Sequence, residues 1–316
     1  MGKGQRNRAQ SARDRIAAQQ VAAKRAERRR RTLIAGGSIV AVLVIVVAFI
    51  VVKSLTGGSS GTSAGAANGQ SVPAVAKSIT TVPASVLDTV GSGPTGASKI
   101  SSLIPVAKAP ALTENGKPEV LYVGGEYCPY CAAERWAMAV ALSRFGTFSG
   151  LNFTHSSSTD VYSSTPTLTF YKSSYTSKYL AFTPVEWFNR NGNATSDTLQ
   201  APTTAEMAIF KKYDNVPYVP STSAGSFPFV DFGNKYLVIG AQYLPSIFGT
   251  QPNPTSQLLG ISWAQVAKDL QDPKSAVAQN VLGAANMMTA ALCKLTNNAP
   301  SNVCSSAAAT AGASGL

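Results

Sequence analysis

The sequence predicts an α/β domain preceded by a single N-terminal transmembrane helix. The run Leu33–Val52 contains 20 uncharged residues, which at 1.5 Å per residue is long enough to cross a bilayer core. Further along, the strand-forming run Glu119–Val123 ends at a Gly-Gly break, and a helical pattern follows from Pro129 to Phe145. Near the end, the strand-forming runs Phe227–Phe232 and Lys235–Gly240 flank a Gly-Asn turn.

The composition and charge of the 316 residues favour a folded domain. The chain is 45% hydrophobic and 13% charged, which excludes general disorder and a coiled coil. Residues 1–32 hold 11 of the 27 basic and 2 of the 15 acidic residues, so most of the net charge of +12 lies in this tail. The rest of the chain is nearly balanced and indicates no nucleic-acid partner, and its single histidine excludes a multi-histidine metal site.

The charges beside the apolar run predict its orientation. Arg28–Arg31 precede it and only Lys53 follows, so the N-terminus should remain in the cytoplasm and the C-terminal part should be exported. The alternative is a cleaved signal peptide, because Ala64–Ala66 has the form of a cleavage site. We expect a basic cytoplasmic tail over 1–32, a transmembrane helix over 33–52, a flexible linker and loosely structured segment over 53–112, an extracytoplasmic domain over 113–305 and a disordered tail over 306–316.

Alternation and turn residues predict the elements of the domain. Strands are expected at 119–123, 151–155, 167–171, 179–182, 227–232 and 235–240, those at 167–171 and 179–182 around a polar turn. Helices are expected at 84–90, at 129–145, at 203–213, from Ser262 with a capping box to Gln265, and from Asp272-Pro273 to about Leu295.

The motif Cys128-Pro129-Tyr130-Cys131 carries the clearest chemistry. At a helix start, the free N–H groups and the helix dipole favour a thiolate at Cys128, facing outward at the helix tip. Pro129 fits the first turn, where its missing N–H costs nothing. Cys131, one turn inward, can then attack a mixed disulfide, so Cys128 is the predicted attacking thiol and Cys131 the resolving thiol. Half of a zinc site and an inert disulfide are the alternatives.

Cys293 and Cys304 lie eleven residues apart, at a helix end and in the loop after it. Neither opens a helix, so a structural disulfide is preferred over a second redox pair.

The order of strand, CPYC, helix and later proline-led strand resembles the thioredoxin fold, and Pro129-Tyr130 is similar to the glutaredoxin dipeptide. The stretch Ser226–Tyr236 resembles the cis-proline loop and following strands of DsbA-like oxidoreductases. This resemblance implies a thioredoxin-like fold with a helical insertion. It also implies that the backbone of Phe227 holds substrate and that Pro228 is the cis-proline, with Pro166 as the rival.

Three further stretches resemble a more specific group. Gly124–Ala137, Ser156–Asp160 and Phe229–Asn234 are similar to the family catalogued as domain of unknown function 929, membrane-anchored proteins with a thioredoxin-like core. The resemblance covers roughly residues 80–305.

One departure from the redox families concerns the buried acid six residues before the first cysteine, where this chain has Tyr122. Glu126 or Glu134 could tune the thiols in its place, and Arg135 could pair with Glu134 on the helix surface. We expect a thiol–disulfide oxidoreductase acting on protein or small-molecule thiols and disulfides, with no metal or organic cofactor and with a redox partner that resets it. The alternative is a binding module in which CPYC is a static disulfide.

Overall fold

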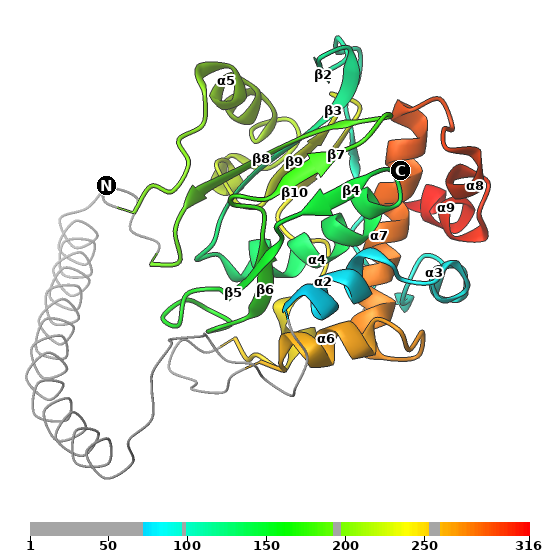
Figure 1. The fold of residues 1–316 in the computed structure, drawn as a ribbon. Helices are drawn as coiled ribbons and strands as arrows, with labels where there is room; N and C mark the ends of the chain where they lie inside the picture. The colour runs from blue at the N-terminus through cyan, green and yellow to red at the C-terminus, as the bar shows by residue number, and fades with distance from the viewer. Residues whose placement is uncertain (1–71, 97–98, 192–196, 253–259) are drawn as a thin grey trace, which may run out of the picture. The chain divides into compact units, whose positions relative to one another are not determined.

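A computed structural model describes residues 72–96, 99–191, 197–252 and 260–316. Within these ranges, helices cover both faces of a central mixed sheet (Figure 1), as the predicted α/β class requires. The predicted cytoplasmic tail, the predicted transmembrane helix and the linker up to residue 71 lie outside the described residues. Within the described ranges, no helix is both long enough and apolar enough to cross a membrane.

The central sheet is built around β3, which pairs in parallel with β8 on one side and antiparallel with β9 on the other. Beyond β9 follow β10 and then β1, both antiparallel to their neighbours, while β2 forms a hairpin with the start of β3. The strands are β1 (Ile104–Pro105), β2 (Thr113–Glu114), β3 (Lys117–Gly125), β8 (Ala181–Phe188), β9 (Phe229–Phe232) and β10 (Tyr236–Ile239).

Alternating residues of β3 supply two separate cores. Val120 and Tyr122 pack on the face covered by α4 (Pro129–Ser143) and α7 (Ala276–Leu295). Leu121 and Val123 point to the other face, which is covered by α5 (Thr204–Tyr213). Because both faces are buried, the stretch Val120–Val123 of β3 is a continuous apolar run, as expected for a central strand with helices on each side.

The helix starts follow the capping residues. Thr203 and Glu206 form a capping box at α5, and the hydroxyl of Ser262 accepts the Gln265 N–H at α6 (Trp263–Asp269). The expected start of the last long helix at Asp272-Pro273 is wrong: α7 begins at Ala276. The Ser275 hydroxyl caps it by accepting the Ala278 N–H, which satisfies a free donor of the first turn.

The segment before Thr113 contains the helix predicted at 84–90, but it is more ordered than expected. α2 (Val72–Thr80) and α3 (Ala84–Val90) pack on the core through Ile79 and Leu87, which are buried. The side-chain amide of Asn286, from α7, donates to the carbonyl oxygens of Leu87 and Gly91. The compact part of the chain therefore includes residues assigned to the loosely structured segment.

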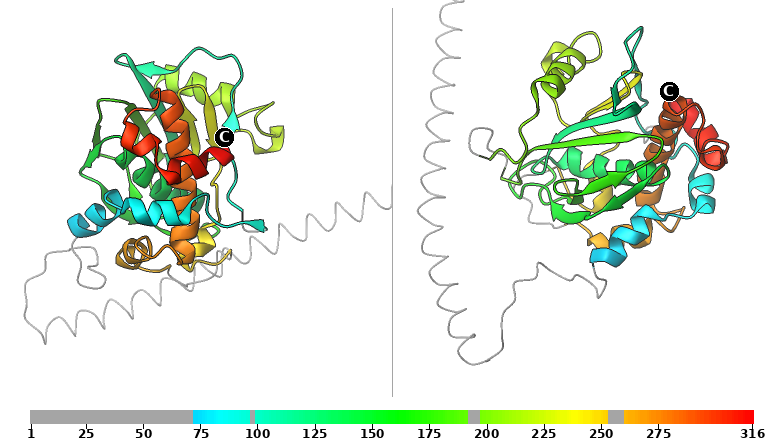
Figure 2. Two further views of the ribbon diagram at one scale, coloured as in Figure 1. Left: turned by 90° about the vertical axis from the view of Figure 1, so that its right-hand side faces the viewer. Right: turned by 45° about the horizontal axis from the view of Figure 1, so that its top comes forward.

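The predicted disordered tail over 306–316 is also wrong. α8 (Ser301–Cys304), α9 (Ala307–Gly312) and the 3₁₀ turn η5 (Ala313–Gly315) lie against α7 (Figure 2). A side chain at Gly312 would collide with the backbone of Asn286, so only a residue without a β-carbon permits this close approach. The small residues of this segment therefore do not indicate disorder, because they allow α9 to pack closely against α7.

The segment between α4 and β8 carries strands where the resemblance implied helices. β4 (Thr147–Ser149) pairs with β7 (Ser174–Thr176), and β5 (Asn152–His155) pairs with β6 (Pro166–Thr169). The expected strands at 167–171 and 179–182 do not pair with each other, since the first joins β5 and the second begins β8. The remaining short turns are η3 (Ser221–Ser223) and η4 (Pro245–Phe248).

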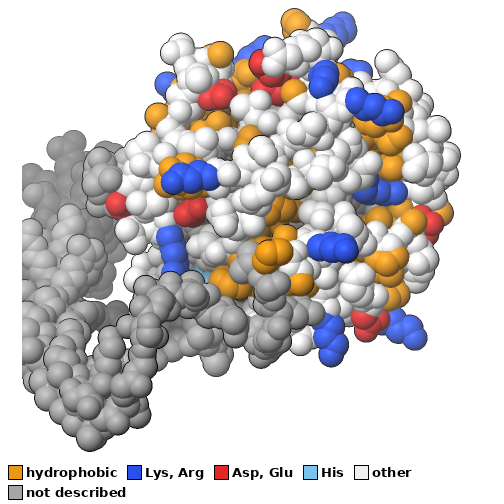
Figure 3. Space-filling model, in the orientation of Figure 1, with side chains coloured by type: hydrophobic (Ala, Val, Ile, Leu, Met, Phe, Trp, Pro, Cys, Tyr) orange, Lys and Arg blue, Asp and Glu red, His pale blue; other side chains and the backbone are white. Residues whose placement is uncertain are grey.

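Lys and Arg side chains are scattered over the face of the molecule seen in Figure 3, between polar and apolar neighbours. This distribution agrees with the nearly balanced charge of residues 33–316.

Candidate functional site

The CPYC motif forms the N-terminus of α4, as predicted. Cys128 is the N-cap residue in an extended conformation, and Pro129 occupies the first turn. The Cys131 N–H donates to Cys128 Sγ at 3.3 Å, so the sulfur takes the position of a capping oxygen. Both cysteines are free thiols. A backbone N–H of the first helical turn therefore points at Cys128 Sγ, the sulfur that was predicted to attack.

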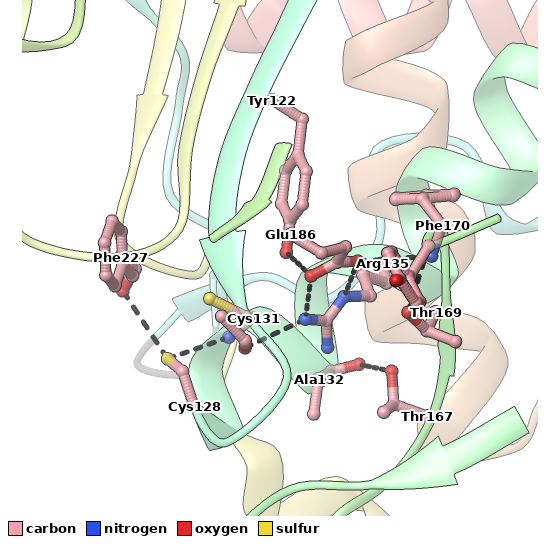
Figure 4. Close-up of polar contacts among 12 residues, drawn as sticks. Tyr122, Cys128, Cys131, Ala132, Arg135, Thr167, Thr169, Phe170, Glu186 and Phe227 are labelled. Atoms are coloured by element: carbon pink, nitrogen blue, oxygen red, sulfur yellow. Dashed lines mark hydrogen bonds and ion pairs between the residues drawn. The ribbon is translucent and has the colours of Figure 1, made fainter. Parts of the chain in front are cut away.

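The loop before β9 brings a second segment to this sulfur. Cys128 Sγ lies 3.8 Å from the carbonyl oxygen of Phe227, 99 residues away in sequence (Figure 4). The Phe227–Pro228 peptide bond is cis. Pro166 has a different role: its carbonyl oxygen accepts the indole N–H of Trp136 at 3.0 Å, which holds α4 against β6. The cis-proline loop that the resemblance implied at Pro228 thus lies beside the motif.

Aromatic packing fixes the position of the Phe227 loop. The centroid of the Phe227 ring lies 6.0 Å from that of Trp187, 6.1 Å from that of Phe188 and 5.8 Å from that of Phe210. Cys128 itself is only 6% exposed. The expectation that this sulfur faces outward is therefore wrong, because the loop that supplies the neighbouring carbonyl also covers it. Only a small part of the Cys128 side chain is therefore in contact with solvent.

The pKa of Cys128 is shifted downward. Burial alone would raise the pKa of this thiol, but hydrogen bonds from the side chain and the backbone N–H of Cys131 oppose it. The charge of Arg135 and the backbone N–H of Tyr130 act in the same direction. Together they bring the pKa below its ordinary value, so a larger share of Cys128 is thiolate at neutral pH.

Cys131 has the opposite character. It is fully buried, and burial raises its pKa well above the ordinary value. The hydrogen bond to Cys128 and the negative charge that Cys128 can carry raise it further, while Arg135 lowers it. The pKa values of the two thiols are thus shifted in opposite directions, downward at the helix tip and upward one turn behind it.

An ion pair beneath the motif escaped the sequence analysis. Arg135 Nε donates to Glu186 Oε1 at 2.8 Å and Arg135 Nη2 to Glu186 Oε2 at 2.6 Å, and both side chains are fully buried. Arg135 Nη2 also donates to the Gly125 carbonyl at 2.9 Å, which ties α4 to the end of β3. Glu186 stands in the apolar run Val185–Phe188, and an acid inside such a run was the signal that could have revealed it.

Tyr122 lies where the redox families carry a buried acid. It is fully buried, and its hydroxyl is 3.5 Å from Glu186 Oε2. Burial raises the pKa of this phenol well above its ordinary value, so Tyr122 is neutral and acts as a hydrogen-bond donor.

The two predicted tuning residues lie in different surroundings. Glu126 is half-buried, and its backbone N–H donates to Phe188. Glu134 is fully buried on α4 and accepts the Gln242 N–H at 2.9 Å; it does not form the expected surface pair with Arg135. Burial raises the pKa of Glu134 to about 8. Arg135 is the charge that acts on both thiols.

Tyr130 and the second cysteine pair complete the set of predicted residues. The Tyr130 ring packs edge-on against the ring of Tyr162, which lies in the loop between β5 and β6, at a centroid distance of 5.9 Å. Cys293 and Cys304 form a disulfide, as predicted, joining the last turn of α7 to α8. Within the described ranges, no three His, Cys, Asp or Glu side chains are grouped as they would be in a metal site.

Comparison with known proteins identifies one family. Residues 106–294 match the family model described as a domain of unknown function, DUF929. Searches among curated proteins and solved structures found no match to the chain.

Proposed function

Because the chain belongs to the DUF929 family, whose description assigns no activity, we propose a function from the site itself: thiol–disulfide exchange by Cys128 and Cys131. One observation carries the proposal. The sulfur of Cys128 caps α4 and lies 3.8 Å from the Phe227 carbonyl, with a second free thiol one helical turn behind it.

The reaction proceeds through a mixed disulfide. The Cys128 thiolate attacks one sulfur of a client disulfide, the client S–S bond breaks, and the other client sulfur leaves as a thiolate. Cys131 then attacks Cys128 Sγ, which forms the Cys128–Cys131 disulfide and releases the second client sulfur. The proton that Cys131 gives up balances the charge on the departing thiolate. Two electrons have passed to the client, and the reverse sequence oxidises a client dithiol.

The arrangement of strands supports the thioredoxin-like part of the proposal. β3 precedes the motif and pairs in parallel with β8, and β9 and β10 follow the cis-proline as an antiparallel pair. This is the order that the resemblance implies for the core, with α4 and α7 on one face. Strands β4 to β7 are then additions to it.

The place of action in this proposal is the outside of a membrane. It rests on the uncharged run 33–52 and on the arginines before it, which favour export of the C-terminal part. A disulfide between Cys293 and Cys304 agrees with an oxidising compartment. A membrane-bound or soluble redox partner would return the CPYC pair to its starting state.

The proposal is tested by trapping. In a Cys131→Ser variant the mixed disulfide at Cys128 has no resolving thiol, so it should accumulate with protein clients or with a small disulfide such as cystine. Non-reducing gels and mass spectrometry would detect it. The matched control is Cys128→Ser, which keeps Cys131 in its buried position and should trap nothing.

The alternative, a binding module with a static disulfide, gives a different result. A static pair would form no adduct in Cys131→Ser under native conditions and would resist reduction by dithiothreitol. Reduction of the wild-type pair at a moderate potential, together with trapping at Cys128 alone, favours exchange chemistry.

A further inference from the structure

Resolution of a mixed disulfide requires Cys131 to lose its proton where no water is in contact with it. The side chain is fully buried, and burial raises its pKa well above the ordinary value. A thiolate in such surroundings needs a hydrogen-bond donor aimed at the sulfur. The identity of this donor matters only if the proposed function holds, and it concerns only the second step, the resolution of the mixed disulfide by Cys131.

The space beside Gly124 brings one donor to this sulfur. A β-carbon placed on Gly124 would lie 3.1 Å from Cys131 Sγ and would collide with the hydroxyl of Tyr122. The sulfur and the hydroxyl therefore border the same small space, which exists because residue 124 has no side chain. Figure 4 shows both side chains next to the ion pair of Arg135 and Glu186.

The Tyr122 hydroxyl is only weakly engaged when Cys131 is a thiol. Its contact with Glu186 Oε2 measures 3.5 Å, at the long limit of a hydrogen bond. That carboxylate already receives two shorter bonds from Arg135. Losing the contact with Tyr122 would therefore leave Glu186 well paired, so the hydroxyl proton is free to turn.

Arg135 is another polar side chain close to Cys131, but most of its donors are already engaged. Its Nε and Nη2 bind Glu186 and the Gly125 carbonyl, and the carboxylate neutralises much of its field. Arg135 Nη1 is buried without an acceptor, and a backbone hydrogen bond from Gly125 already lowers the pKa of Cys131. These two groups are the competing donors that an experiment must distinguish from Tyr122.

We propose that Tyr122 is the positioning residue that stabilises the Cys131 thiolate, by turning its hydroxyl proton from Glu186 to Cys131 Sγ during resolution. No proton leaves Tyr122. The Cys131 proton goes to the departing client thiolate, the bond between Cys128 and the client breaks, and the Cys128–Cys131 bond forms. Tyr122 thus takes over by hydrogen bonding what a buried acid would do by proton transfer.

A chromogenic aryl disulfide, dithio-bis-nitrobenzoate, separates the two steps in the reduced full chain purified in detergent. Attack by Cys128 releases the first coloured thiolate, and resolution by Cys131 releases the second. In Tyr122→Phe the first release should be unchanged. The second should slow roughly four- to fifteenfold, since a lost hydrogen bond to a charged group lowers the thiolate fraction while nucleophilicity partly compensates. Its pH midpoint should rise by about one to two units.

The matched control is Tyr175→Phe. The Tyr175 hydroxyl also binds α4, donating to the Leu142 carbonyl at 2.9 Å, but at the opposite end of the helix. The Tyr175→Phe variant should therefore have a lower folding stability, but the pH midpoint of its second release should be that of the wild type. Fluorotyrosine at position 122 keeps the hydroxyl and makes it a stronger donor, so the midpoint should fall. This substitution decides the question if the phenylalanine variant does not fold.

An unchanged second release in Tyr122→Phe, in both rate and pH midpoint, would overturn the inference and leave Arg135 Nη1 or the Gly125 N–H as the donor. An unmoved midpoint with fluorotyrosine would do the same. If the wild-type chain gives no first release from Cys128, the proposed function fails, and this outcome is distinct from a normal first release with an unaffected second.

Discussion

Replacing Glu186 with glutamine removes the negative charge that faces Arg135 in the core. Both side chains are fully buried, and two bonds of 2.8 and 2.6 Å join them. Glutamine keeps the shape and one acceptor oxygen but leaves the guanidinium charge uncompensated. Breaking one side of such a pair costs about 3–5 kcal/mol of folding free energy. This is a large fraction of the roughly 5–15 kcal/mol that stabilises a typical domain.

Urea unfolding measures this loss, with the fluorescence of Trp136 as a signal because this side chain is fully buried in α4. With a denaturant dependence of about 3 kcal/mol per molar urea, the midpoint of Glu186→Gln should fall by about 1–1.7 M. The control Glu114→Gln changes an exposed residue of β2 and should shift stability by less than about 0.5 kcal/mol.

The double variant Arg135→Met with Glu186→Leu removes both charges together. It should recover most of the lost stability, because the cost of Glu186→Gln lies in the unpaired charge and not in the missing bond. A Glu186→Gln midpoint equal to that of Glu114→Gln would refute the reasoning and would mean that water or backbone movement compensates Arg135.

Three further predictions concern single groups. Alkylation of Cys128, followed by mass spectrometry, should remain fast below the ordinary thiol pKa of about 8.5 and decline only as pH falls through the lowered pKa; a midpoint above that of a free thiol would contradict it. Burial raises the pKa of Glu134 to about 8, so unfolding releases a proton between about pH 4.5 and 8 and stability falls as pH rises through this window. In Glu134→Gln the urea midpoint should fall less between about pH 5 and pH 8.5 than in the wild type. An equal fall in both proteins would exclude the raised pKa of Glu134 as the cause. Replacing Cys293 and Cys304 by alanine should cost about 3 kcal/mol by loop-closure entropy, measured as a lower thermal midpoint; an unchanged midpoint would show that the disulfide adds nothing.

The local part of the site could be predicted from the sequence. A strand, a Gly-Gly break and a helix starting at Pro129 are encoded by neighbouring residues, and Cys128 indeed caps α4. The covering of Cys128 could not be foreseen, because it depends on the ring of Phe227 packing among side chains of β8 and α5. Exposure of a side chain is decided by tertiary contacts, and a single sequence contains no direct record of them.

The same reason explains the missed ion pair and the missed helices. Arg135 and Glu186 are 51 residues apart, and each taken alone resembles an ordinary surface charge. β8 contains Pro184, which argues against a central strand but is tolerated here because β8 is an edge strand. The residues of α9 are too small to give an apolar periodicity, yet their size is what permits contact with α7.

The spacing of the four cysteines bears on how the chain acquires the correct bond. Cys293 meets Cys304 across eleven residues, whereas a bond from Cys131 to Cys293 would close a loop of 162. In an unfolded chain the longer closure is disfavoured by about 2.4 kcal/mol, or roughly fiftyfold. Oxidation of the unfolded chain would therefore join neighbouring cysteines before distant ones. Pairing of Cys293 with a CPYC cysteine would thus be disfavoured by loop-closure entropy before any tertiary structure exists.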